Sequence, residues 1–118
     1  MKIRIKRVYD KSEPNDGVRI LVERLWPRGL SKKDAHVDIW LKEMAPSTEL
    51  RKWFSHDPAK WDEFRKRYFK ELDKNREEVK KLLEVTETND VTFVYGSREK
   101  EFNSTRALRD YLEKHGGS

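Results

Sequence analysis

The residues with the most evident capacity to bind a ligand lie in segment 23–31, between an apolar stretch and a predicted helix. This segment carries two arginines, Arg24 and Arg28, on either side of Trp26. Guanidinium groups bind phosphates and carboxylates through paired hydrogen bonds, and the free N–H groups of a helix N-terminus also attract anions. The segment therefore predicts an anion-binding site with Trp26 as one wall. Equally consistent is a structural interpretation, in which Trp26 belongs to the core and the arginines pair with surface acids.

A second polar segment, 96–103, follows the apolar stretch 91–95 and precedes another predicted helix. If the predicted strands 18–22 and 91–95 are parallel, both polar segments lie at the carboxyl edge of one sheet, where open α/β folds bind their ligands. The ligand-binding residues predicted on this basis are Arg24, Trp26, Arg28, Tyr95, Ser97, Arg98 and Asn103. For Asn103 the alternative is a simple helix N-cap.

Three side chains are candidates for acid–base catalysis: Glu23, His56 and Glu99. Burial of either carboxyl group would raise its pKa toward neutrality. His56 precedes Asp57, but Asp57 and Pro58 together are typical of a helix start, which favours a structural role for this pair. The chain has no cysteine, no metal-site spacing of His, Asp or Glu, and no glycine-rich nucleotide loop, so the sequence predicts neither a metal nor a cofactor.

An α/β fold is expected to position these segments. Apolar alternation and short apolar runs predict strands at 3–7, 18–22 and 91–95. Helices are predicted at 31–44, 50–54, 57–72, 75–83 and 103–112. The long helical stretch before the third strand suits a parallel crossover, whereas the first two strands can pair as an antiparallel hairpin across loop 10–17. The sequence thus predicts a single domain, 1–118, with a small mixed sheet of three or more strands covered by about five helices.

Composition indicates a compact chain with a highly charged surface. Charged residues make up 42% of the 118 residues, but 27 Lys and Arg offset 22 Asp and Glu, and the aromatic content of 11% is too high for a disordered chain. An excess of Lys, Arg and Glu without Cys or Gln is typical of thermophilic proteins. With no apolar run long enough for a membrane span and no secretion signal pattern, we expect a cytoplasmic protein without a membrane partner.

Several residue strings resemble a known family. Leu-Trp-Pro-Arg-Gly at 25–29 and Trp-Phe-x-His-Asp-Pro at 53–58 are long and specific, and further matches extend over nearly the whole chain. They resemble the YeaO-like family (DUF488), a domain of unknown function. The resemblance implies a compact cytosolic α/β protein with no established activity. Family members usually carry His where this chain has Phe102, so a family activity based on that His would be lost here or would use another group, such as His56.

Two functions have positive support in the sequence, and a protein-interaction domain remains the default without it. The first is binding, with or without catalysis, of a small phosphorylated or carboxylated ligand by Arg24, Arg28 and Arg98. The alternative is a nucleic-acid-binding module, which the net charge of +5 favours in general terms. That alternative requires Trp26, Trp53 or Tyr95 to be exposed for base stacking. The sequence predicts no oligomeric state.

Overall fold

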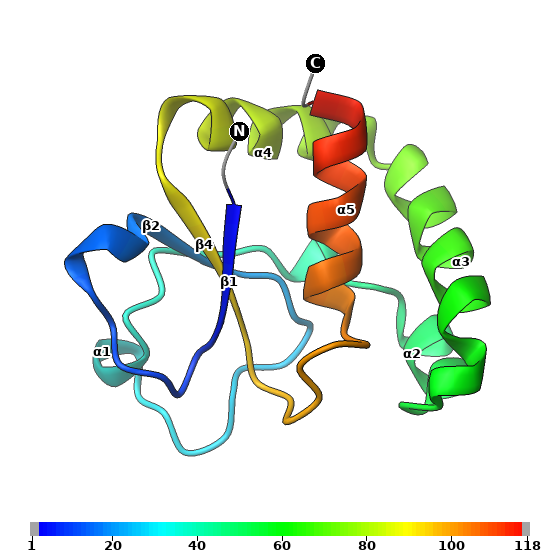
Figure 1. Ribbon diagram of the computed structural model, residues 1–118, viewed down its shortest axis with the longest axis horizontal. Coiled ribbons are helices and arrows are strands. Elements are labelled where there is room, and N and C mark those ends of the chain that lie inside the picture. The colour runs from blue at the N-terminus through cyan, green and yellow to red at the C-terminus, as the bar shows by residue number, and fades with distance from the viewer. Residues whose placement is uncertain (1–2, 117–118) are drawn as a thin grey trace.

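The computed structural model, which describes residues 3–116, shows a four-stranded sheet flanked by helices (Figure 1). The strands are β1 (Ile3–Arg7), β2 (Val18–Leu21), β3 (Ile39–Trp40) and β4 (Val91–Tyr95). Their order in the sheet is β1-β4-β2-β3, and each pairing is parallel. The five α-helices in this range are α1 (Lys32–Ala35), α2 (Thr48–Phe54), α3 (Trp61–Asp73), α4 (Arg76–Thr88) and α5 (Ser104–Gly116). The predicted α/β class, with about five helices around a small sheet, is confirmed.

The direction of the strands differs from the expected mixed sheet. The antiparallel hairpin between the first two strands does not form, because β4 lies between β1 and β2 and pairs in parallel with both. All five residues of β4 are buried, which suits a central strand, whereas β1 is largely half-buried, which suits an edge. Gly17 allows β2 to start beside β4, because a Cβ at this position would collide with the Asp90 carbonyl group.

The helix predicted at 31–44 is also wrong beyond its first turn. Ser31 caps α1 as expected by accepting a hydrogen bond from the Asp34 N–H, but the chain leaves the helix at His36, whose φ is 51°. Residues 39 and 40 then form β3 beside β2, with Ile20 opposite Ile39. The apolar spacing that suggested a helix is also compatible with a strand followed by a short 3₁₀ turn, and hydrogen bonding to β2 decides between them.

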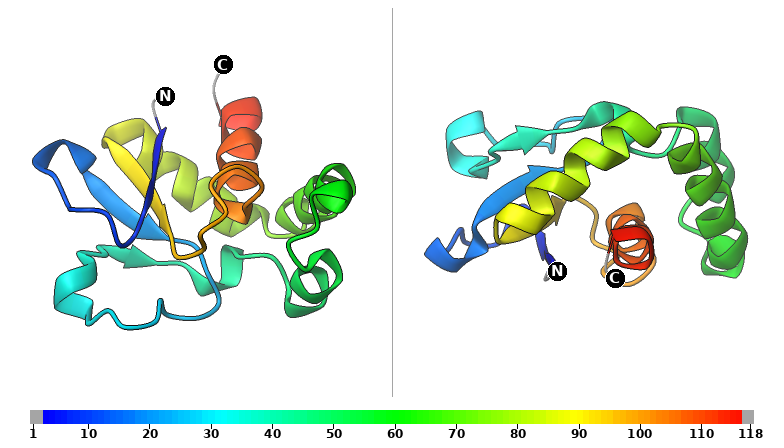
Figure 2. Two further views of the ribbon diagram at one scale, coloured as in Figure 1. Left: turned by 60° about the horizontal axis from the view of Figure 1, so that its bottom comes forward. Right: turned by 90° about the horizontal axis from the view of Figure 1, so that it is seen from above.

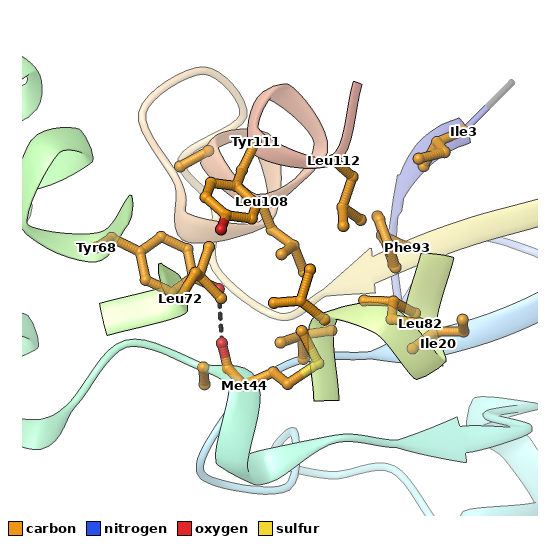
Figure 3. Close-up of a cluster of buried hydrophobic side chains, with 14 of the residues drawn as sticks. Ile3, Ile20, Met44, Tyr68, Leu72, Leu82, Phe93, Leu108, Tyr111 and Leu112 are labelled. Atoms are coloured by element: carbon orange, nitrogen blue, oxygen red, sulfur yellow. Dashed lines mark hydrogen bonds between the residues drawn. The ribbon is translucent and has the colours of Figure 1, made fainter. Parts of the chain in front are cut away.

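The two faces of the sheet bury different clusters, as the alternation of side chains along a strand requires. Ile20 and Phe93 face a large core built with apolar side chains of α2 to α5, whereas Leu21 and Val94 face a smaller cluster with Ala35 of α1. Figure 3 shows part of the large core, in which the buried Tyr68 hydroxyl donates a hydrogen bond of 2.7 Å to the Met44 carbonyl. One face of the sheet therefore packs against α2 to α5. The other, called the α1 face below, packs against α1 (Figure 2).

The strand direction determines where polar loops gather. Strand β1 begins, and α5 ends, at the same end of the molecule (Figure 1). The carboxyl ends of β2 and β4 lie at the opposite end, where each strand runs into a loop that leads to the next helix. Within residues 3–116, no helix has both the length and the apolar character needed to cross a membrane.

Candidate functional site

A cavity of about 770 Å³ opens at the carboxyl edge of the sheet. Its walls come from the loop after β2, from α2 and the residues after it, and from the β4–α5 loop together with the first turn of α5. Because β2 and β4 are parallel neighbours, the two polar segments singled out from the sequence do lie at one edge of the sheet. This is the region where ligands bind in open α/β folds.

The structure brings only part of the predicted site together around this cavity. Of the predicted binding and catalytic residues, those lining it are Glu23, Arg24, His56, Tyr95, Ser97 and Asn103. Trp26, Arg28, Arg98 and Glu99 are not among the lining residues. Trp26 packs instead on the α1 face, with its ring 5.2 Å from Trp40 and its Nε1 donating to the Leu30 carbonyl at 2.7 Å. The three arginines expected to hold one anion are thus not gathered in the cavity.

Arg24 is engaged mainly with the backbone. Its Nη2 donates to the Ala45 carbonyl at 3.1 Å, its Nε to the Pro46 carbonyl at 3.3 Å, and its Nη1 lies 3.7 Å from the carboxylate of the exposed Glu43. The side chain therefore ties the loop after β2 to the segment that leads into α2. Its charge contributes to the cavity, while two of its five N–H groups are taken by backbone carbonyls.

Glu23 connects the two loops. Its Oε1 accepts a hydrogen bond of 2.9 Å from the Gly96 N–H, and its backbone carbonyl accepts one of 2.7 Å from Trp40 Nε1. Burial raises the pKa of the Glu23 carboxyl group above its ordinary value, although the Gly96 hydrogen bond and the nearby Arg51 oppose the shift. A half-buried carboxyl group with a raised pKa can act as a general acid or base, so Glu23 keeps this chemical capacity.

The β4–α5 loop is held by its own polar groups. Oε2 of Glu99 accepts hydrogen bonds from the N–H groups of Glu101 and Phe102, at 3.0 and 3.3 Å, and these bonds lower the pKa of its carboxyl group. Arg7 Nε donates to the Ser97 carbonyl at 3.0 Å and braces the loop from β1. A carboxylate with a lowered pKa that already accepts two hydrogen bonds is a weak base, so the structure favours a structural role for Glu99.

Asn103 and His56 also have local structural explanations. The Asn103 Oδ1 accepts from the Arg106 N–H at 3.0 Å and its Nδ2 donates to the Glu99 carbonyl at 2.9 Å, so Asn103 is the N-cap of α5. His56 is exposed in a sharp turn after α2, and Asp57 caps the next turn by accepting from the Ala59 N–H. Burial raises the pKa of Tyr95, whose side chain is almost fully enclosed.

Sequence reasoning missed the other lining residues, among them Arg51, Lys52 and Thr105. Arg51 and Lys52 lie on α2, whose place beside the cavity depends on tertiary packing that the sequence pattern does not show. Thr105 follows the N-cap Asn103 within the first turn of α5, and the sequence predicted only an ordinary helix residue at this position. No signal in the sequence distinguished these three from the many other charged and polar helix positions.

The electrostatic character of the cavity is positive. Arg24, Arg51 and Lys52 contribute cationic groups to its walls, against the single carboxylate of Glu23. The lining also includes the apolar side chains of Phe54, Phe64 and Phe102. In the part of the chain that the structure describes, no group of three or more His, Cys, Asp or Glu side chains could hold a metal ion.

Fold and site together define an α/β domain with a basic cavity at the carboxyl edge of a parallel sheet. Residues 2–116 match a family described as "Inactive DUF488-N3 subclade", and the chain belongs to this DUF488-N3i family. The uncharacterized protein YeaO of Escherichia coli is 43% identical over 112 residues, which cover 95% of this chain and 97% of that protein. Uncharacterized proteins of Mycobacterium tuberculosis and Mycobacterium bovis are 51% identical over 71 residues, 60% of each chain.

These comparisons confirm the YeaO-like resemblance seen in the sequence strings. No solved structure matches the chain.

Proposed function

We propose that this protein binds a small anionic ligand, phosphorylated or carboxylated, in the carboxyl-edge cavity and does not catalyse its conversion. The observation that carries the proposal is the combination of three cationic side chains and a helix N-terminus around one cavity. Its volume of about 770 Å³ falls within the range of roughly 300–1,000 Å³ typical of small-molecule sites. The apolar residues of the lining add a surface for the uncharged part of such a ligand.

Binding without catalysis fits the state of the candidate catalytic groups. Glu99 is occupied by hydrogen bonds within its own loop, and His56 is exposed with no hydrogen-bond partner among residues 3–116. The description "Inactive" of the matching family supports the same view. Glu23, the lining carboxyl group with a raised pKa, is the candidate that keeps a capacity for acid–base chemistry.

The nucleic-acid alternative has less support. It needs an exposed aromatic face for base stacking. Tyr95 is buried, and Trp53 is half-buried with Arg67 over its ring at 4.0 Å and Lys60 at 5.1 Å. The large apolar side chains exposed in the described part of the chain are Tyr9 and Leu25.

The proposal is tested by chemical denaturation in the presence of phosphate, sulfate, small carboxylates, phosphosugars, nucleotides, and short DNA and RNA at matched ionic strength. A ligand present at about a hundred times its Kd adds roughly 2.7 kcal/mol to the free energy of unfolding. The cavity variant is Arg51→Ala with Lys52→Ala. Its matched control is Arg76→Ala with Lys80→Ala, which removes the same charge from exposed positions of α4 outside the cavity lining.

We expect at least one small anion to stabilise the wild type and the control, and to stabilise the cavity variant much less. Equal losses in both double variants would mean that the anion responds only to net charge. Stabilisation by DNA or RNA alone, falling steeply with salt, would replace the proposal with the nucleic-acid alternative. The absence of any response would refute both.

A further inference from the structure

We infer that the anion is a phosphate group, held at the N-terminus of α5 by the backbone N–H groups of Ser104 and Thr105 and by the Thr105 hydroxyl. This inference rests on the proposed function and deepens it by naming the ligand group and the atoms that hold it. The mode of binding is hydrogen bonding to preformed donors, and no covalent step is involved.

The first observation is an unsatisfied hydroxyl group on a residue that lines the cavity. Thr105 is 1% exposed and lines the cavity, and its Oγ1 is buried without a hydrogen-bond partner among residues 3–116. Two other buried polar atoms in this range lack partners, Arg65 Nε and Arg109 Nε, but neither residue lines the cavity. Buried hydroxyl groups are nearly always hydrogen-bonded in folded proteins, so this one needs an explanation.

The second observation is the way Asn103 caps α5. Its side-chain oxygen accepts from the N–H of Arg106, and its carbonyl accepts from the N–H groups of Arg106 and Ala107. The cap therefore serves the third and fourth N–H groups of the helix. The first two, on Ser104 and Thr105, have no acceptor within residues 3–116, and both residues line the cavity.

The two carboxylates that accept hydrogen bonds from the β4–α5 loop do not fill this position. Glu99 accepts from the N–H groups of Glu101 and Phe102, and Glu23 accepts from the N–H of Gly96. The two acids thus serve three N–H groups of the β4–α5 connection and leave the pair on Ser104 and Thr105 to an external acceptor. Helix α5 has 13 residues, and its Leu108 and Leu112 are completely buried, so these donors are held on a fixed element.

The positive charge around these donors favours phosphate over carboxylate. Two N–H groups and one hydroxyl provide three hydrogen-bond donors, which is enough for one to each of the three terminal oxygens of a phosphomonoester. The positive end of the helix dipole and the cations Arg51 and Lys52 on another wall of the cavity favour the more highly charged group.

The test uses inorganic phosphate and acetate as probes on the full chain. Affinities are measured by calorimetry, and the amide signals of Ser104 and Thr105 are followed by NMR. The variants are Thr105→Val, which keeps the shape and removes the hydroxyl group, and Thr105→Ser, which restores it. We expect phosphate to shift both amide signals, and Thr105→Val to weaken phosphate binding about tenfold or more, since hydrogen bonds to charged groups contribute roughly 1.5–3 kcal/mol. Thr105→Ser should bind phosphate within about threefold of the wild type.

Several results would overturn the inference while leaving the proposed function intact. Phosphate binding that depends on Arg51 and Lys52, but is unchanged in Thr105→Val and does not shift the Ser104 and Thr105 signals, places the anion elsewhere in the cavity. Acetate binding as tight as phosphate binding removes the assignment to phosphate. If the wild type binds no anion in the panel, the proposed function fails as well. The amide shifts are read in the wild type, so the test holds even if a variant is unstable.

Discussion

Two buried polar regions of this protein differ in how completely their hydrogen bonds are satisfied. On the α1 face of the sheet, Arg19 donates to the Asp16 carboxylate at 2.7 Å and to the carbonyls of His36 and Ala35 at 3.0 and 3.1 Å. Thr92 donates its hydroxyl to the Asp16 carbonyl at 2.7 Å. At the carboxyl edge, by contrast, the Thr105 hydroxyl and the first two N–H groups of α5 have no partner among residues 3–116.

This difference separates a structural network from a binding site. Both regions contain cations and buried polar groups, so neither charge nor burial distinguishes them. On the α1 face, Lys6 also donates to Asp16 and completes a group in which each strong donor has an acceptor. Such a network stabilises the fold and offers little to a ligand, whereas unpaired donors at a cavity are available to one.

The largest expected effect comes from breaking the paired network. Arg19→Leu leaves the buried Asp16 carboxylate with Lys6 as its remaining cation and should lower the free energy of unfolding by about 3–5 kcal/mol. Denaturation by guanidinium measures this loss. Lys33→Leu, at an exposed position of α1, is the control and should change stability by no more than about 0.5 kcal/mol. A loss below about 1 kcal/mol in Arg19→Leu would mean that the network is not a main source of stability.

A matched pair of threonines sharpens the comparison. Thr92 and Thr105 are 0% and 1% exposed, and in each case valine removes the hydroxyl group while preserving the shape. Thr92→Val should destabilise the protein by about 1–2 kcal/mol because it leaves the Asp16 carbonyl unpaired. Without ligand, Thr105→Val should leave stability unchanged or raise it by up to about 1 kcal/mol, since it removes an unpaired buried hydroxyl group. Equal losses in the two variants would show that the Thr105 hydroxyl group has a structural partner.

The smallest effect is expected in the pH dependence of stability, where the two regions should act in opposite directions. Burial alone would raise the pKa of Asp16, but hydrogen bonds from the Glu13 N–H, Lys6 and Arg19 outweigh it and hold the pKa below its ordinary value. Its stabilising contribution is therefore present above the unfolded-state pKa and is lost as the pH falls through the lowered value. Glu23 has a raised pKa, so its contribution is present at low pH and is lost as the pH rises through the raised value.

Denaturation curves from pH 3 to 8 for the wild type, Asp16→Asn and Glu23→Gln test these signs. Relative to the wild type, Glu23→Gln should gain stability as the pH rises above the ordinary pKa of a glutamate, near 4.3. Asp16→Asn should lose stability, relative to the wild type, as the pH rises from 3. Differences of the same sign in the two variants would contradict the assigned environments.

Much of the fold followed from the sequence, because its signals are local. The strands 3–7 and 91–95 and the caps Ser31 and Asp57 lie where apolar pattern and capping chemistry predicted them. Strand β3 was not predicted, because the spacing of apolar residues after Ala35 fits a helix as well as a strand. Only the pairing with β2 decides between the two. The strand direction was mispredicted for a similar reason, because the sequence does not show which strand lies in the centre of the sheet.

The candidate site was less predictable, because it depends on the direction of loop side chains and on distant packing. Segments 23–31 and 96–103 were correctly placed at one edge of the sheet, but residue types alone do not show that Trp26 packs on the α1 face. Arg51 lines the cavity only through the position of α2. The role proposed for Thr105 rests on a buried hydroxyl group without a hydrogen-bond partner among residues 3–116. No sequence pattern indicates that such a partner is missing.

The most direct test of the account compares the effect of inorganic phosphate on the free energy of unfolding of the wild type, Thr92→Val and Thr105→Val, at one pH and ionic strength. The account predicts that phosphate stabilises the wild type and Thr92→Val by the same amount and Thr105→Val by much less. Equal stabilisation of all three proteins, or of none, would contradict the claim that the unpaired donors at the start of α5 form an anion-binding site.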